Sequence, residues 1–223
     1  MHRFTLAFAI LLPIAQAWAQ VTVQEYPLPS RHFAHDVWAD AAPDGPIWIS
    51  FQRSGHLGIL DPKSGKIDAV ALGEGSSPHG VIAGPDGAPW LTDGGQGAIV
   101  RVDPKTREVK KWPLPKERGY VNLNTAIFDK AGIHWFTGQS GVYGRLDPRS
   151  GDLKVLDAPK GRGPYGIHAT PDGVVYYASL AGSHIARIDA ASNKAIVIEP
   201  PTPRQGARRV WSDSKGNIWV AEG

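Results

Sequence analysis

The chain has 223 residues, a formal net charge of +3 and no cysteine. The lack of cysteine excludes disulfides and thiolate metal sites. The weak positive charge, without a cluster of lysine and arginine, argues against a nucleic-acid-binding surface. The 26 glycines and 19 prolines recur at turn positions and form no low-complexity tract. The length suits one large all-β domain.

Residues 1–19 have the pattern of a secretory signal peptide. A basic start at His2 and Arg3 precedes a short apolar run, and Ala17 and Ala19 form a cleavage site. The apolar run is too short to span a membrane. We therefore expect cleavage before Gln20 and a mature protein that is secreted, periplasmic and free of the membrane. The remaining domain covers residues 20–223.

One cassette of about 42 residues recurs from residue 45 onward. Each copy has a glycine, two variable residues and an aromatic residue, and each of the first four has an aspartate twelve or thirteen residues after the aromatic. The aromatic residues are Trp48, Trp90, Trp135, Tyr176 and Trp219, and the aspartates are Asp61, Asp103, Asp147 and Asp189. A fixed period of this length, made of short strands, is typical of a β-propeller.

The second repeat shows how one cassette forms one blade. Apolar strands are expected over residues 79–83, 89–92, 98–102 and 108–114, separated by turns rich in glycine, proline and aspartate. Four antiparallel strands of this kind make a propeller blade. The aromatic residue is expected to pack between neighbouring blades, with a ligand-stacking ladder as the alternative.

The number of strands predicts an open arc. Residues 21–28 match a fourth strand, four complete blades follow, and residues 210–213 and 218–221 supply two more strands. About five blades are therefore present. Because a seven-bladed ring would need more, we expect the chain to be a C-terminally truncated piece of a longer propeller, and the domain over residues 20–223 to be incomplete.

Aligning the repeats on their aromatic residue reveals a column of polar residues at the start of each innermost strand. Equivalent positions of the blades surround the axis at one mouth of a propeller. The column therefore predicts a mouth that binds a ligand. If the mouth is catalytic, we expect His79 to be the base, His35 to be a second catalytic-site contact, and the other members to contact the substrate. Its members are His35, His79, Asn124, Tyr165 and Arg208.

A second column lies three residues after the aromatic and is formed by Phe51, Asp93, Gly138, Ser179 and Glu222. Asp93 is in the same repeat as His79, so the two predict a base with its orienting acid, or two ligands of a metal ion. Glu222 is in the same repeat as Arg208 and is a further candidate for substrate binding. The alternative is that these are hydrogen-bonded or solvated loop residues. The other histidines of the mature chain are expected at turns or on the surface: His32, His56, His134, His168 and His184.

Several segments resemble the virginiamycin B lyase (streptogramin lyase) family across nearly all of residues 21–223. They are Ser77-Pro78-His79-Gly80-Val81, Gly163-Pro164-Tyr165-Gly166-Ile167, Trp135-Phe136-Thr137 and the linker strands over 25–29 and 111–115. The resemblance implies a seven-bladed propeller, monomeric at full length, that acts on a small molecule or cyclic peptide. It also implies a Mg²⁺-dependent lyase that opens the ester of a cyclic depsipeptide by elimination.

The resemblance also implies roles for individual residues. The family uses histidines of two adjacent blades, matched by His35 and His79, and an acid fourteen residues after the histidine, matched by Asp93. Ser77 stands where the family has glutamate, Ala34 stands where it has proline, and the family's active blades are its last two. Two other functions stay open. One is a non-catalytic propeller that binds a peptide, glycan or protein, and the other is a metal-dependent lactonase like the gluconolactonase propellers.

Overall fold

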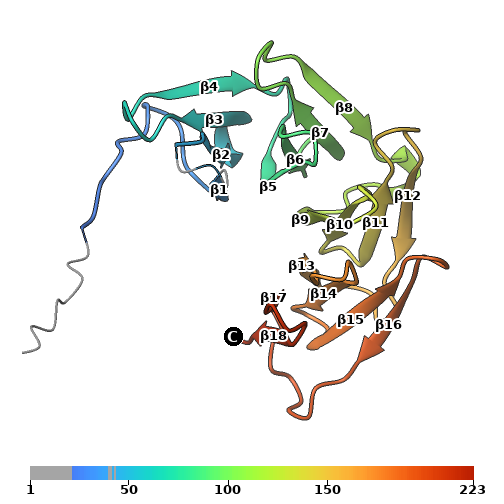
Figure 1. Cartoon of the computed structure of the whole chain (residues 1–223). Helices are drawn as coiled ribbons and strands as arrows, with labels where there is room; N and C mark the ends of the chain where they lie inside the picture. Colours follow the sequence, from blue (N-terminus) through green and yellow to red (C-terminus); the bar gives the residue numbers. More distant parts are fainter. Residues whose placement is uncertain (1–21, 40–41, 43) are drawn as a thin grey trace, which may run out of the picture.

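The computed structural model describes residues 22–39, 42 and 44–223, and the predicted signal peptide lies outside them. The described chain forms five antiparallel sheets. The sheets follow an arc around one axis with their innermost strands toward it, which confirms the predicted propeller of four-stranded blades (Figure 1). No described helix is long and apolar enough to cross a membrane.

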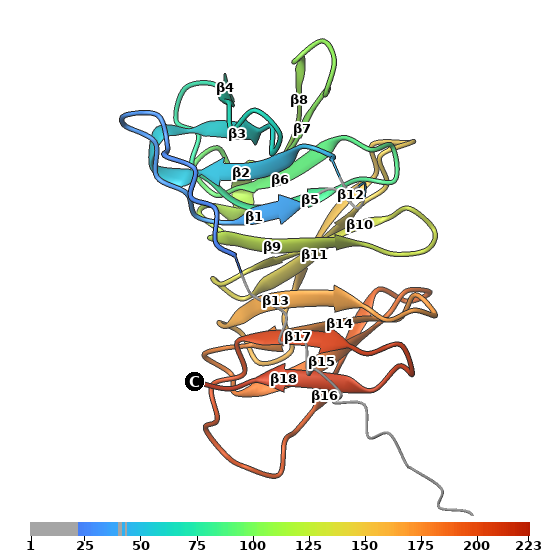
Figure 2. The ribbon, with the colours of Figure 1, turned by 60° about the vertical axis from the view of Figure 1, so that its left-hand side comes forward.

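Each sheet runs in chain order from its innermost strand outward. The first comprises β1 (Val37–Ala39), β2 (Ile47–Phe51), β3 (His56–Leu60) and β4 (Ile67–Ala71), and the second β5 (Pro78–Ala83), β6 (Pro89–Asp93), β7 (Ala98–Val102) and β8 (Val109–Pro113). The third comprises β9 (Leu123–Phe128), β10 (His134–Gly138), β11 (Val142–Leu146) and β12 (Leu153–Asp157), and the fourth β13 (Pro164–Ala169), β14 (Val175–Ser179), β15 (His184–Asp189) and β16 (Lys194–Ile198). The fifth comprises β17 (Arg209–Ser212) and β18 (Ile218–Ala221), and two 3₁₀ helices are η1 (Gln52–Ser54) and η2 (Lys116–Arg118). Figure 2 shows the innermost strands side by side.

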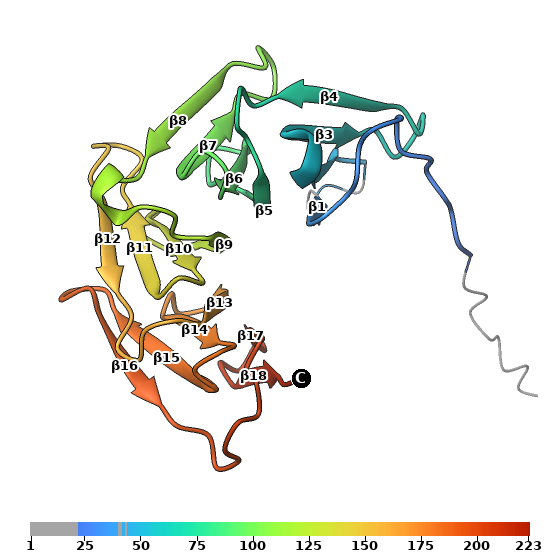
Figure 3. The same cartoon turned by 180° about the vertical axis from the view of Figure 1, so that it is seen from behind.

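The prediction of a strand over residues 21–28 is wrong for residues 22–28, which the structure describes. Residues 22–36 contain no strand, and they pass beside the first sheet (Figure 3). Tyr26 packs against the apolar cluster of that sheet, and its hydroxyl donates to the carbonyl of Pro62 (3.1 Å). A fourth strand needs the edge of a third strand as its partner, and the described residues contain no preceding sheet.

The cassette aspartate closes the turn after each third strand, as predicted. Oδ1 of Asp103 accepts the N–H groups of Lys105 and Thr106, both at 2.9 Å. The N–H of Arg107 in turn donates to the carbonyl of Asp103, and Arg107 has a positive φ of 65°. The bonds from Thr106 and Lys105 hold the pKa of the Asp103 carboxyl below its usual range.

The cassette tryptophan packs between sheets and is tied to the hairpin turn before it. Trp90 and Trp135 are buried, and the ring of Trp90 meets the edge of Phe128 in the third sheet at 5.3 Å. The indole Nε1 of Trp90 donates to Asp86 (3.1 Å), and that of Trp135 donates to Asp129 (2.8 Å). Trp90 and Trp135 therefore bury their rings while the turn aspartate satisfies the polar atom, which confirms the packing role for these two. Trp219 in the two-stranded fifth sheet is 63% exposed and does not pack between sheets in the described part of the chain.

The prediction that the histidines outside the polar column lie at turns or on the surface is wrong for His134 and His184. His134 in β10 is fully buried and His184 in β15 almost so. The ring of His134 lies among Trp90 and Phe128, and neither of its nitrogens has a hydrogen-bond partner. Burial lowers the pKa of His134 to about 3.

The buried His134 predicts a loss of stability in mild acid. The unfolded chain binds a proton at this residue below its usual pKa of about 6.5, whereas the folded chain does not until about pH 3. Between pH 7 and pH 5 the wild type should therefore lose about 2 kcal/mol that His134→Leu does not lose. Urea unfolding of both proteins at the two pH values measures this. Equal losses in both would contradict it.

Candidate functional site

The first polar column meets at one end of the innermost strands, as the alignment predicted. The rings of His35 and His79 lie 4.2 Å apart, and Nδ2 of Asn124 lies 3.0 Å from Nε2 of His79. The ring of Tyr165 is 6.3 Å from that of His79. The guanidinium of Arg208 lies 5.4 Å from the centre of the Tyr165 ring, and its Nη2 donates to the hydroxyl (3.4 Å). Five sheets thus contribute to one continuous polar group, here called the mouth.

The mouth is built on irregular strands. The register of β5 against β6 shifts between Pro78 and Val81, and that of β13 against β14 shifts between Pro164 and Ile167. A bulge of this kind removes backbone groups from the ladder and re-aims the side chain that it carries. Unpaired N–H and C=O groups are costly when buried, so they need other partners.

A hydroxyl two residues after the cassette aromatic supplies these partners and joins adjacent sheets. Thr92 accepts the N–H of Gly80 in its own sheet (3.0 Å) and donates to the carbonyl of Asn124 in the next. Ser50 likewise accepts the N–H of Asp36 (2.9 Å) and donates to the carbonyl of His79 (2.6 Å). In each bridge, a hydroxyl of one sheet therefore holds the backbone carbonyl of the mouth residue in the next sheet.

The series continues in the third sheet and changes in the fourth. Thr137 accepts the N–H of Thr125 (3.4 Å) and donates to the carbonyl of Tyr165. The fourth sheet has Ala178 at this position. There the N–H of Gly166 donates directly to the carbonyl of Arg208 (3.0 Å), and a Cβ on Gly166 would lie 2.7 Å from that oxygen. Glycine is needed at Gly166 and at Gly80 alike, whether or not the hydroxyl is present, since a Cβ on Gly80 would lie 2.9 Å from the carbonyl oxygen of Asn124.

His79 forms the buried floor of the mouth. Its side chain is only 6% exposed, and its Nδ1 is buried without a hydrogen-bond partner. Burial, with the nearby charges of His35, Arg209 and Arg208, lowers the pKa of His79 to about 3, so the imidazole is neutral at neutral pH. The His35 side chain is 35% exposed, so it is the imidazole that a ligand over the mouth can reach.

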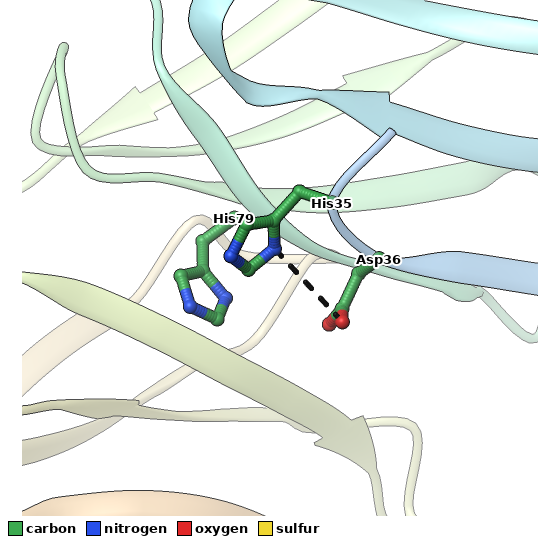
Figure 4. A group of neighbouring side chains, drawn as sticks. All are labelled: His35, Asp36 and His79. Atoms are coloured by element: carbon green, nitrogen blue, oxygen red, sulfur yellow. Dashed lines mark ion pairs between the residues drawn. The ribbon is translucent and has the colours of Figure 1, made fainter. Parts of the chain in front are cut away.

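Asp36 is the carboxylate beside the two histidines (Figure 4). Its Oδ1 lies 4.0 Å from Nδ1 of His35 and 3.5 Å from Nη2 of Arg209. Asp36 is not among the site residues predicted from the repeats. The signal was available one position after the polar column, where Asp36 is the only acid in a series with Gly80, Thr125, Gly166 and Arg209.

Asp93 has a structural role, which differs from the expectation that it would partner His79 or bind a metal. It is fully buried. Its Oδ1 accepts the N–H groups of Ser77, Gly95 and Gln96 at 2.9 to 3.0 Å, and its Oδ2 accepts the hydroxyl of Ser76. Both oxygens therefore hold the β4–β5 and β6–β7 loops together.

Glu222 also differs from its predicted place. It lines a separate surface pocket of about 270 Å³ with Pro200, Pro201 and Gln205. The cavity at the axis, of about 320 Å³, is instead lined by residues of all five sheets, including His35, Asp36 and Arg209. Glu222 follows β18, the second strand of the fifth sheet, whereas the residues of the mouth lie at the start of the innermost strands.

Comparison with known proteins agrees with the fold and the motifs. The sequence model of the virginiamycin B lyase family matches residues 11–223. The chain belongs to this family. The resemblance in the sequence motifs is thereby confirmed.

Three known proteins are similar to this chain over part of their length. Selenomethionine-substituted virginiamycin B lyase from Staphylococcus aureus superposes with a TM-score of 0.79 at 25% identity, over 89% of this chain and 67% of that one. A streptogramin B lyase structure gives 0.77 at 23% identity, over 89% and 65%. A gluconolactonase of Zymomonas mobilis subsp. mobilis is 30% identical over 99 residues, 43% of this chain and 25% of that protein. The chain thus spans about two thirds of the lyases and a quarter of the gluconolactonase.

The hydroxyl bridges predict a sharp dependence of stability on Thr92. Thr92→Val keeps the volume but leaves the N–H of Gly80 and the carbonyl of Asn124 without partners. We expect a loss of about 2 to 4 kcal/mol in unfolding free energy, because each buried unpaired group costs about 1 to 3 kcal/mol. Thr92→Ser keeps the hydroxyl and should stay close to the wild type. Denaturant unfolding measures both, and equal stability of the two variants would refute the bridge.

Proposed function

We propose that the mouth opens the ester of a cyclic depsipeptide by elimination, in the periplasm or outside the cell. The observation that carries the proposal is the convergence of polar side chains from five sheets around the exposed imidazole of His35. Membership of the virginiamycin B lyase family supports it. A structure of a catalytically inactive virginiamycin B lyase with quinupristin, similar to this chain at a TM-score of 0.78, supports a substrate of this class.

The proposed reaction begins with proton removal by His35. Its imidazole takes the proton from the carbon next to a carbonyl of the substrate. The electron pair left behind forms a carbon–carbon double bond, and the bond from the adjacent carbon to the ester oxygen breaks. The ester oxygen leaves as part of a carboxylate and keeps the bonding electrons, so no water is consumed.

The other mouth residues position the reacting groups. The buried, neutral His79, held by Asn124, packs against the ring of His35 and orients it. The exposed guanidinium of Arg208 and the hydroxyl of Tyr165 can bind the carbonyl oxygens and the carboxylate that is released. We assign proton removal to His35 rather than His79, because Nδ1 of His79 has no exposed surface.

The resemblance to the family implies that Mg²⁺ binds at the mouth. The candidate ligand atoms there show whether the site suits this ion. Mg²⁺ prefers near-octahedral oxygen ligands. Within residues 22–39, 42 and 44–223, the only group of three candidate ligands consists of one carboxylate, Asp36, and two imidazoles. This donor set does not fit Mg²⁺, so no step of the proposed reaction runs through that ion.

A second candidate is the hydrolysis of a lactone, favoured by the 30% identity over 99 residues to the gluconolactonase. The two reactions differ in mass balance. Elimination opens the ring without changing the mass of the substrate, whereas hydrolysis adds one water. A propeller that only binds its ligand would leave the ring closed.

Turnover of quinupristin by the full chain tests the proposed function. Mass spectrometry should show ring opening without a change in mass, and chromatography separates the open product from the substrate. His35→Gln should lower the rate by about 10² to 10⁴-fold, which is the usual contribution of a general base. His56→Gln, in β3 of the same sheet, should retain the wild-type rate. A product heavier by one water, or equal rates in the wild type and His35→Gln, would count against elimination at this site.

A further inference from the structure

We infer that His35, Asp36 and His79 form a binding site for a divalent transition-metal ion, of the Zn²⁺ or Co²⁺ class, where the first and second sheets meet at the mouth. Figure 4 shows the two imidazoles and the carboxylate grouped there. His35 and Asp36 lie directly before β1, and His79 lies in β5.

The spacing suits a single ion. One candidate ligand atom from each of the three residues lies within 4.8 Å of the other two. The two imidazole rings are 4.2 Å apart and inclined by 59°. Ligands at about 2.0 to 2.2 Å from one ion lie roughly 3 to 3.5 Å from each other, so small side-chain rotations close the site.

The buried His79 supplies an independent observation. More than nine-tenths of the residue is buried, and Nδ1 has no hydrogen-bond partner. Oδ1 of Asn124 is also buried without one, while Nδ2 of Asn124 faces Nε2 of His79. Rotation of the Asn124 carboxamide exchanges its oxygen and nitrogen. Nε2–H of His79 then donates to Oδ1, and Nδ1 is left unprotonated as a ligand.

This arrangement is the usual one for a metal-bound histidine. One ring nitrogen binds the ion, and the other donates to an oxygen that fixes the ring. Two imidazoles and one carboxylate are typical ligands of Zn²⁺ and related ions, and three protein ligands leave positions open for water. The same donors select against Mg²⁺, which prefers oxygen.

Arg209 is the competitor for this site. Its guanidinium lies 3.5 Å from Oδ1 of Asp36, so an incoming ion must displace it from the carboxylate. Removal of the Arg209 charge should therefore strengthen metal binding, the opposite of the effect of removing a ligand. A bound ion also takes a lone pair of His35, so metal binding and the proposed proton removal exclude each other.

Cobalt titration of the full chain, stripped of metal by a chelator, tests the inference. Co²⁺ should develop visible ligand-field bands at one equivalent, Zn²⁺ should abolish them, and Mg²⁺ should not. Asp36→Asn and His35→Gln should weaken binding by at least about tenfold. Arg209→Met should tighten it severalfold. Circular dichroism and thermal melting of each variant show whether it is folded.

His32→Gln is the matched control. His32 and His56 form another close imidazole pair, with ring centres 4.9 Å apart. His32→Gln should bind Co²⁺ as the wild type does. The inference is overturned if the wild type shows no bands, if folded Asp36→Asn binds equally well, or if His32→Gln abolishes binding. The readout is binding, so it stands or falls separately from the turnover of quinupristin.

Discussion

The mouth depends on how this chain satisfies the backbone groups that its innermost strands leave unpaired. The bulges in β5 and β13 turn the side chains of His79 and Tyr165 toward the axis but take backbone groups out of the ladder. Ser50, Thr92 and Thr137 repair this with one hydroxyl each. The same atoms join neighbouring sheets, so the geometry of the site and the cohesion of the arc have one cause.

Two arginines and one aspartate set the charge of the mouth. Arg208 and Arg209 both lie over the ring of Tyr165, at 5.4 and 5.9 Å. Asp36 is the carboxylate that offsets them, and it pairs with Arg209 across the axis from the first sheet to the fifth. The surroundings therefore favour an anion near Arg208 and keep His79 uncharged. This balance suits a reaction that releases a carboxylate.

The sequence predicted the features that repeat and missed those that do not. The period of the aromatic residue placed the blades, the turn aspartates and the five polar residues of the mouth, because a repeat imposes the same backbone on each copy. His134 was misplaced, since a single buried histidine among Trp90 and Phe128 leaves no pattern. Asp93 was misread because its three backbone donors come from turns whose geometry the sequence does not show. Asp36 was missed because the equivalent positions of the other repeats hold no second acid, so no repeated residue type marks this position.

The direct bond between Gly166 and Arg208 makes the junction of the fourth and fifth sheets unlike the other junctions of the arc. Elsewhere the backbones of adjacent sheets are separated by two hydrogen bonds in series, of 2.9 and 2.6 Å at Ser50, whereas here one bond of 3.0 Å suffices. The fourth and fifth sheets are therefore joined here by backbone atoms alone, with no side-chain hydroxyl between them. A ring of identical copies would offer a ligand several equivalent orientations. The direct seam at Gly166 and the differing side chains of the mouth make the positions around the axis unequal, so an asymmetric ligand meets a different surface in each orientation.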